Sequence, residues 1–187
     1  MLLTRPLSLF WPDVRVERIS DVTPAFLAAR GVRGLILDLD NTLVPYGLMD
    51  EIPALVGWAR GIAASGVQAR LVSNAMPERV RVWSDRLDIP GVGVAGKPFP
   101  SGFRRAMRDM QLSPREVAVV GDQVFTDVLG GKLSGAFTVL VQPLSQNALP
   151  HTRVARALER IVLSGFPAER RIAAATGEPL PGEGGSS

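Results

Sequence analysis

Short apolar runs alternate along the chain with stretches in which apolar side chains recur every three to four positions. Runs rich in valine, leucine and isoleucine are typical of buried strands. The clearest occupy residues 34–39, 69–73, 92–94, 117–120 and 137–141. Helical spacing falls between them, over residues 51–64, 77–87, 101–110 and 125–134. The chain is therefore expected to alternate strands with helices.

This alternation predicts an α/β fold: a doubly wound, Rossmann-like parallel sheet with helices on both faces. Ligands of such folds bind beyond the carboxyl ends of the strands. Polar residues follow four of the expected strands, namely Asp38 and Asp40, then Ser73 and Asn74, then Lys97, and finally Asp122. We expect these side chains to meet at one edge of the sheet.

Composition narrows the class of protein. The chain has 187 residues, of which 46% are hydrophobic and 21% charged, as expected for one ordinary globular domain. Cysteine is absent, which excludes a disulfide framework, a thiolate zinc site and a cysteine nucleophile. No apolar run is long enough to cross a bilayer, and the N-terminus lacks the features of a signal peptide. We therefore expect a cytoplasmic protein.

The formal net charge of +3 is concentrated near the C-terminus. Such a small excess does not indicate nucleic-acid binding, so no nucleic-acid partner is expected. The sequence leaves the oligomeric state open. Four segments are expected: a lead-in that packs on the core, a catalytic domain, a basic amphipathic helical segment and a disordered tail, over residues 1–30, 31–150, 151–175 and 176–187.

Asp38 and Asp40 form the sharpest chemical signal. Alternation along a strand would point both side chains the same way, and two close carboxylates repel unless a cation lies between them. Mg²⁺ is a natural candidate, because it prefers oxygen ligands and binds one or two carboxylates together with phosphate. A structural metal or a capping pair is the alternative interpretation.

Four motifs appear in order: Asp38-x-Asp40-x-Thr42, Ser73, Gly96-Lys97-Pro98, and Gly121-Asp122 followed by Asp127. Together they resemble the haloacid-dehalogenase-like (HAD) phosphohydrolases. Residues 12–163 resemble the YqeG branch in particular, which is similar to the phosphatidylglycerophosphate phosphatases of mitochondria and plastids.

The resemblance implies a role for each residue. Asp38 would be the nucleophile, and Asp40 would protonate the leaving oxygen and then activate water. Mg²⁺ would be bound by Asp38, the backbone carbonyl of Asp40 and Asp122, with Thr42 and Asp127 in support. Ser73 and Lys97 would bind the phosphoryl group, and the backbone near Asn74 would add a donor.

Several of these residues have simpler interpretations. Ser73 or Asn74 would cap a helix, Lys97 would be an ordinary surface lysine, and Asp127 would favour a helix N-terminus. Gly130 and Gly131 are expected to permit close packing rather than to bind phosphate.

Predicted helices and strands fill the intervals from Asp40 to Ser73 and from Ser73 to Lys97, which leaves no room for a cap domain. Relatives without a cap tend to act on large or surface-bound substrates. This favours a lipid head group, a protein or a nucleic acid over a small sugar phosphate, and phosphatidylglycerophosphate is the best candidate. Residues 152–163 add an apolar stripe opposite three arginines, which suits either a helix lying on anionic membrane or a helix docked on the sheet.

Other functions remain as alternatives. The substrate would instead be a phosphoprotein, a nucleotide or another soluble phosphate. A phospho-acceptor signalling domain uses similar residues, although Asp40 offers an acid and base for rapid hydrolysis. A non-catalytic partner-binding protein is a further alternative, and a dehalogenase is disfavoured because it needs neither Asp40 nor Mg²⁺.

Overall fold

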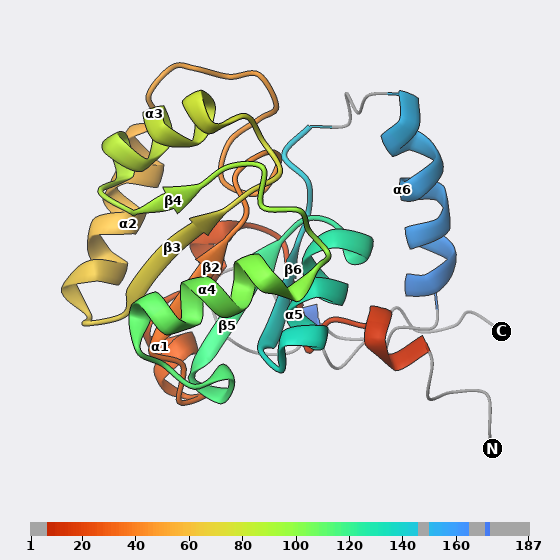
Figure 1. Ribbon diagram of the computed structural model, residues 1–187, viewed down its shortest axis with the longest axis horizontal. Helices are drawn as coiled ribbons and strands as arrows, with labels where there is room; N and C mark the ends of the chain where they lie inside the picture. The colour runs from red at the N-terminus through yellow and green to blue at the C-terminus, as the bar shows by residue number, and fades with distance from the viewer. Residues whose placement is uncertain (1–6, 146–149, 165–170, 173–187) are drawn as a thin grey trace, which may run out of the picture.

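The computed structural model describes residues 7–145, 150–164 and 171–172. Within them a seven-stranded sheet has the order β4-β3-β2-β5-β6-β1-β7, and every pairing is parallel (Figure 1). The strands are β1 (Val14–Val16), β2 (Gly34–Leu37), β3 (Gln68–Val72), β4 (Gly91–Val92), β5 (Val117–Gly121), β6 (Phe137–Val141) and β7 (Arg171–Ile172). The predicted α/β class and parallel sheet are confirmed.

Helices cover both faces of the sheet (Figure 1). The α-helices are α1 (Pro24–Ala28), α2 (Pro53–Ala64), α3 (Pro77–Leu87), α4 (Pro100–Met110), α5 (Leu129–Ser134) and α6 (Pro150–Leu163). Shorter turns are η1 (Leu7–Phe10), η2 (Ile19–Asp21), η3 (Pro114–Glu116) and the π-helical η4 (Val124–Val128). A proline in the first turn of α1 to α4 helps to fix where each begins.

Alternation along the central strand divides the core into two layers. Leu35 and Leu37 of β2 pack with the buried side chains of α1, α2 and α3. Ile36, which points the other way, packs with the apolar stripe of α4 that includes Phe103 and Met107. The fully buried β2 therefore has an apolar side chain on each face, as expected for a central parallel strand.

The sequence pattern missed β1, α1 and β7, and β7 lies within residues 151–175, where a helical segment was expected. Strand β1 has only three residues, which is too short for a clear alternation, and it pairs in parallel with β6. Asp13, just before it, accepts hydrogen bonds from the backbone nitrogen and the hydroxyl of Thr138, at 2.8 and 2.9 Å. Tertiary contacts of this kind, rather than local preference, hold the segment in the sheet.

The helix expected over residues 125–134 is two elements. It begins as the π-helical turn η4 and continues as α5, which ends at Gly135 in the left-handed conformation. The third expected strand is also shorter than 92–94, because Val94 has a φ of 49° and cannot continue an extended strand.

Helix α6 uses only part of the expected apolar stripe for packing: Val162 of the stripe, with Leu163, packs against Val124, Val128 and Leu140. Glu159 is buried and accepts a hydrogen bond of 2.8 Å from the backbone nitrogen of Val124. The indole of Trp11 donates to the carbonyl of Val162 at 3.0 Å. Leu158 and Ile161 of the expected stripe are instead exposed. None of the described helices combines the length and apolar character that crossing a bilayer requires.

Gly131 lets α5 lie close to the sheet. A Cβ at this position would meet Thr138 Cγ2 at 2.6 Å and Val119 Cβ at 3.1 Å. At Gly130 it would meet the Phe103 ring at 2.3 Å. Both glycines therefore serve close packing.

Replacing Gly131 with alanine tests this packing. We expect Gly131→Ala to lower the free energy of unfolding by about 1–3 kcal/mol, because the neighbouring strands must shift. Gly57→Ala on α2 is the matched control, since its Cβ would meet nothing within 4 Å. That change should raise stability by about 0.5–1 kcal/mol. Urea denaturation of both variants measures the difference, and equal effects would contradict the packing argument.

Candidate active site

The expected polar residues lie where the parallel strands end. Asp38 directly follows β2, Ser73 follows β3, and Asp122 follows β5. Lys97 lies between β4 and α4, and Asp127 lies on η4. Because all these strands are parallel, their carboxyl ends bring the five residues to one edge of the sheet (Figure 1).

Lys97 is the centre of this group. Its Nζ lies 2.6 Å from Asp38 Oδ1 and 2.6 Å from Asp127 Oδ1. The side chains of all three residues are at least nine-tenths buried. Burial lowers the pKa of the Lys97 ammonium, but Asp127 and Asp38 outweigh it and raise that pKa above its usual value. Lys97 is therefore a buried, charged residue and not a surface lysine.

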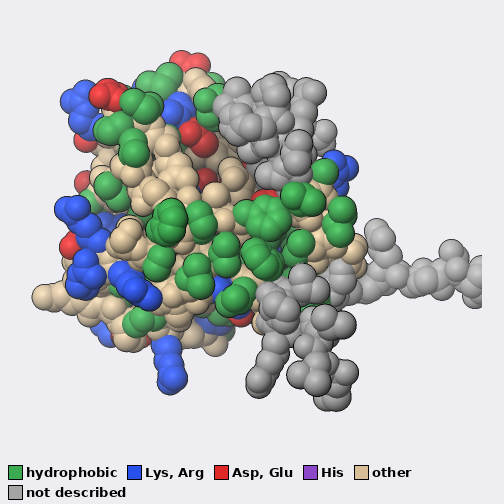
Figure 2. Space-filling model, turned by 45° about the vertical axis from the view of Figure 1, so that its right-hand side comes forward, with side chains coloured by type: hydrophobic (Ala, Val, Ile, Leu, Met, Phe, Trp, Pro, Cys, Tyr) green, Lys and Arg blue, Asp and Glu red, His purple; other side chains and the backbone are tan. Residues whose placement is uncertain are grey.

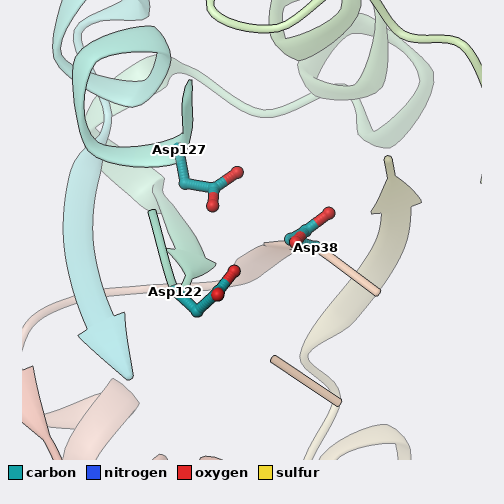
Figure 3. A group of neighbouring side chains, drawn as sticks. All are labelled: Asp38, Asp122 and Asp127. Atoms are coloured by element: carbon teal, nitrogen blue, oxygen red, sulfur yellow. The ribbon is translucent and has the colours of Figure 1, made fainter. Parts of the chain in front are cut away.

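Asp122 completes a group of three buried carboxylates (Figure 3). One oxygen from each of Asp38, Asp122 and Asp127 lies within 4.8 Å of the others. The hydroxyl of Thr42 lies between two of them, 3.3 Å from Asp122 Oδ1 and 3.5 Å from Asp38 Oδ2. Thr42 thus links the residue after β2 to the residue after β5.

The π-helical turn η4 places Asp127 in the group. Its Oδ2 accepts a hydrogen bond of 3.1 Å from the backbone nitrogen of Gln123, while Oδ1 binds Lys97. A Cβ at Gly121 would lie 2.2 Å from Asp127 Cγ, so only glycine leaves room for this carboxylate. Burial raises the pKa of Asp127 to about 6, despite the opposing effect of Lys97.

Asn74 fixes the backbone of Lys97. Its Oδ1 accepts from the Lys97 backbone nitrogen at 2.9 Å, and its Nδ2 donates to the Lys97 carbonyl at 3.2 Å. Ser73 is buried, and its Oγ accepts from the backbone nitrogen of Ala75 at 3.2 Å. Neither residue caps α3, whose N-cap is Met76. Asn74 therefore holds Lys97 in position rather than projecting its amide toward a ligand.

Asp40 lies apart from the buried carboxylates and pairs with Arg79 of α3. Arg79 Nε and Nη2 lie 2.8 and 2.7 Å from Asp40 Oδ1. A tight turn after Asp40, with Asn41 at a φ of 62°, separates its side chain from Asp38. Burial raises the pKa of Asp40, and the Arg79 hydrogen bonds and charge oppose that rise. A carboxyl group with a raised pKa is suited to exchanging protons.

Sequence reasoning did not identify Arg79. The one local signal is its place in the first turn of α3, where a positive charge is unfavourable with respect to the helix dipole. The simpler interpretation of Asp127 as a helix N-terminal residue accounts for only one of its two contacts. Its Oδ2 accepts from the backbone nitrogen of Gln123, but its Oδ1 binds Lys97.

The donor set suits a small divalent cation. Three buried carboxylates carry three negative charges, against the one positive charge of Lys97. Burying unbalanced charge is costly, and carboxylate oxygens are preferred ligands of hard cations. Asp38 and Asp122, with oxygens turned toward Thr42, would hold the ion, and Asp127 would support it.

Comparison with known proteins identifies the family. A sequence profile described as HAD-hydrolase-like matches residues 94–149. The chain is 39% identical over 163 residues to "Probable phosphatase YqeG" of Bacillus subtilis (strain 168), covering 87% of this chain and 95% of that protein. Together with the site at the carboxyl edge, this makes the chain a phosphatase of the HAD superfamily. It belongs to the YqeG family within that superfamily.

Two further proteins are informative. The chain is 33% identical over 155 residues to phosphatidylglycerophosphate phosphatase 1, chloroplastic, of Chlamydomonas reinhardtii. The match covers 76% of this chain and 56% of that protein. The solved structure of NagD from E. coli K-12 matches with a TM-score of 0.50 and 14% identity, covering 64% of this chain and 93% of NagD. The NagD likeness shows a shared fold.

The Asn74 contacts give a test of the site. We expect Asn74→Ala to lower phosphatase activity by roughly 10–100-fold, because small displacements of a positioned group have effects of this size. The melting temperature should change little, since Asn74 itself is exposed. Activity within about twofold of the parent protein would show that Lys97 does not depend on Asn74.

Proposed function

We propose that the protein is a Mg²⁺-dependent phosphomonoester hydrolase that works through an aspartyl-phosphate and converts phosphatidylglycerophosphate to phosphatidylglycerol. The observation that carries the chemistry is the contact of Lys97 with Asp38 at the end of β2, with Asp40 two residues further on. The proposed nucleophile Asp38 thus contacts the ammonium group of Lys97, and a second carboxyl group, that of Asp40, follows in the same short segment.

In the first step, an oxygen of Asp38 attacks phosphorus and the bond from phosphorus to the ester oxygen breaks. Asp40 donates a proton to the departing oxygen, which leaves as an alcohol. Lys97 and the Ser73 hydroxyl bind the phosphoryl oxygens, where negative charge is spread in the transition state. Lys97 also holds one oxygen of Asp38 at 2.6 Å and so orients this carboxyl group for attack.

In the second step, Asp40 removes a proton from water, and the water oxygen attacks phosphorus. The bond from phosphorus to Asp38 breaks, which releases inorganic phosphate and restores the carboxylate. One carboxyl group thus serves first as acid and then as base. When bound, Mg²⁺ would neutralise phosphoryl charge and help to align the substrate.

Two observations support a lipid-borne substrate. The chloroplast relative is named as a phosphatidylglycerophosphate phosphatase. Among the described residues, α2 and α3 are the helices between Asp40 and Lys97, so no cap domain lies there. An open site of this kind suits a head group that remains attached to a membrane.

Exposed apolar side chains surround this edge of the sheet. We call them the apolar rim: Tyr46, Met49, Met76, Val94, Phe99 and Leu144. All six follow carboxyl ends of strands. Hydrophobic side chains also gather across the face drawn in Figure 2. The rim would contact the acyl region of anionic membrane while the head group reaches Lys97.

Phosphate release tests the proposed reaction. We expect release from phosphatidylglycerophosphate in mixed micelles, dependent on Mg²⁺ and abolished by chelator. Asp38→Asn should lower the rate by at least about 1,000-fold, because it removes the nucleophile. A soluble aryl phosphate and a phosphoserine peptide are measured beside the lipid.

Each arm has a distinct meaning. Faster turnover of a soluble substrate than of the lipid would discard the lipid assignment and keep the reaction class. Turnover retained by Asp38→Asn would overturn the aspartyl-phosphate step. A stable phosphoenzyme without release would favour a signalling role.

The apolar rim gives a second test. We expect Met76→Ser to lower turnover of phosphatidylglycerophosphate in vesicles by about 5–10-fold, from the loss of apolar contact with lipid. Serine is a favourable N-cap, so the fold should be unaffected. Turnover of the aryl phosphate should not change. Leu133→Ser is the matched control, because Leu133 is exposed on α5 away from the rim. Equal losses in the two variants would argue against a role for the rim.

A further inference from the structure

Arg79 uses all three guanidinium nitrogens at the edge of the site. Nε and Nη2 bind Asp40 Oδ1 at 2.8 and 2.7 Å. Nη1 donates to the carbonyl of Leu48 at 2.6 Å, and Nη2 donates to the carbonyl of Pro45 at 3.1 Å. One side chain from α3 thus holds both the carboxylate and the loop that follows it.

The contacts leave one oxygen of Asp40 for chemistry. Both arginine nitrogens bind Oδ1, and within the described residues Oδ2 has no hydrogen-bond partner. Fixing one oxygen restricts rotation of the carboxylate, so that the other has a defined direction. The pair is also shielded, since the Arg79 and Asp40 side chains are 14% and 17% exposed.

Arg79 occupies a position in α3 where a positive charge is unfavourable, which indicates that its contacts require a guanidinium group. It lies in the first turn of α3, where a positive charge opposes the helix dipole. A lysine could neutralise Asp40 but could not reach a carboxylate and two carbonyls with one planar, rigid group. The contacts with Asp40 and the loop are thus made at a cost to helix stability.

We propose that Arg79 is a positioning residue that orients Asp40 for proton transfer to the leaving oxygen. The inference rests on the proposed function, in which Asp40 is the acid. Asp40 lies outside the group of buried carboxylates, and the contacts with Arg79 are what give its carboxyl group a fixed orientation.

The importance of a well-oriented Asp40 depends on the leaving group of the substrate. An alkoxide leaving group, as in phosphatidylglycerophosphate, is strongly basic and needs a proton as it departs. A 4-nitrophenolate leaving group is stable as an anion and needs little help. Loss of a well-oriented acid therefore slows the alkyl ester far more than the aryl ester, whereas general damage to the site slows both.

The experiment measures kcat/KM for both esters with the full chain and Mg²⁺. This parameter reports the steps up to phosphorylation of Asp38, when the leaving group departs. We expect Arg79→Met to lower kcat/KM for phosphatidylglycerophosphate on the order of 100-fold and for 4-nitrophenyl phosphate by less than about 5-fold. Arg79→Lys should fall between Arg79→Met and the parent, and it is the variant to use if Arg79→Met does not fold.

Arg86→Met is the matched control. Arg86 is also on α3 and donates to the carbonyl of Met49 in the same loop, but it has no contact with Asp40. It should leave the ratio of alkyl to aryl activity unchanged. If Arg86→Met shifted the ratio as Arg79→Met does, the loop rather than Asp40 would be responsible, and the proposal would be overturned.

Asp40→Asn separates this proposal from the function on which it rests. Selective loss of alkyl activity in both Asp40→Asn and Arg79→Met supports the proposal. Selective loss in Asp40→Asn with equal losses on both esters in folded Arg79 variants overturns the role of Arg79 and keeps the role of Asp40. No selectivity in Asp40→Asn would show that Asp40 is not the acid, and the proposal for Arg79 would fail with it.

Discussion

Three carboxylates buried at one edge of a sheet would repel one another, and the ammonium group of Lys97 is what allows Asp38 and Asp127 to lie so close. Other features depend on this pairing. Asn74 grips the backbone on both sides of the Lys97 α-carbon, and Gly121 leaves space for the Asp127 carboxylate. Removing the ammonium would leave charge in a place that water reaches poorly. The ion pairs of Lys97 therefore determine the local stability of this edge of the sheet as well as its chemistry.

The two aspartates of the first motif, Asp38 and Asp40, lie in different environments and pair with different cations. Asp38 is buried against an ammonium, whereas Asp40 is turned outward to a guanidinium on α3. The turn at Asn41 makes this divergence possible within a few residues. A compact point charge suits the buried group, and a planar fork suits the carboxylate that must keep one oxygen in a set direction. The same negative charge thus acquires two environments, which suits the proposed roles of Asp38 as nucleophile and Asp40 as acid.

Much of this arrangement could be predicted from the sequence, because it depends on local patterns. Apolar runs identified the central strands, and the order of polar residues after them indicated one shared edge. What could not be predicted depends on contacts distant in the chain. The three residues of β1 carry too weak a pattern. Only part of the apolar stripe of α6 packs on the core, and Glu159 adds a buried hydrogen bond that no pattern predicts. The partnership of Arg79 with Asp40 joins residues 39 positions apart, and no periodicity reports it.

Lys97 lies 59 residues after Asp38 and 30 before Asp127, so its two ion pairs close large loops of chain. Such contacts form late in folding, because the entropy lost on closing a long loop comes before the contact can stabilise the fold. Individual helices such as α2 can begin to form from local contacts alone. The central strands and η4 must all be in place before Lys97 meets both partners. During refolding, catalytic activity would thus recover only when the tertiary structure is complete. Helical content would recover earlier, because helices such as α2 form from local contacts.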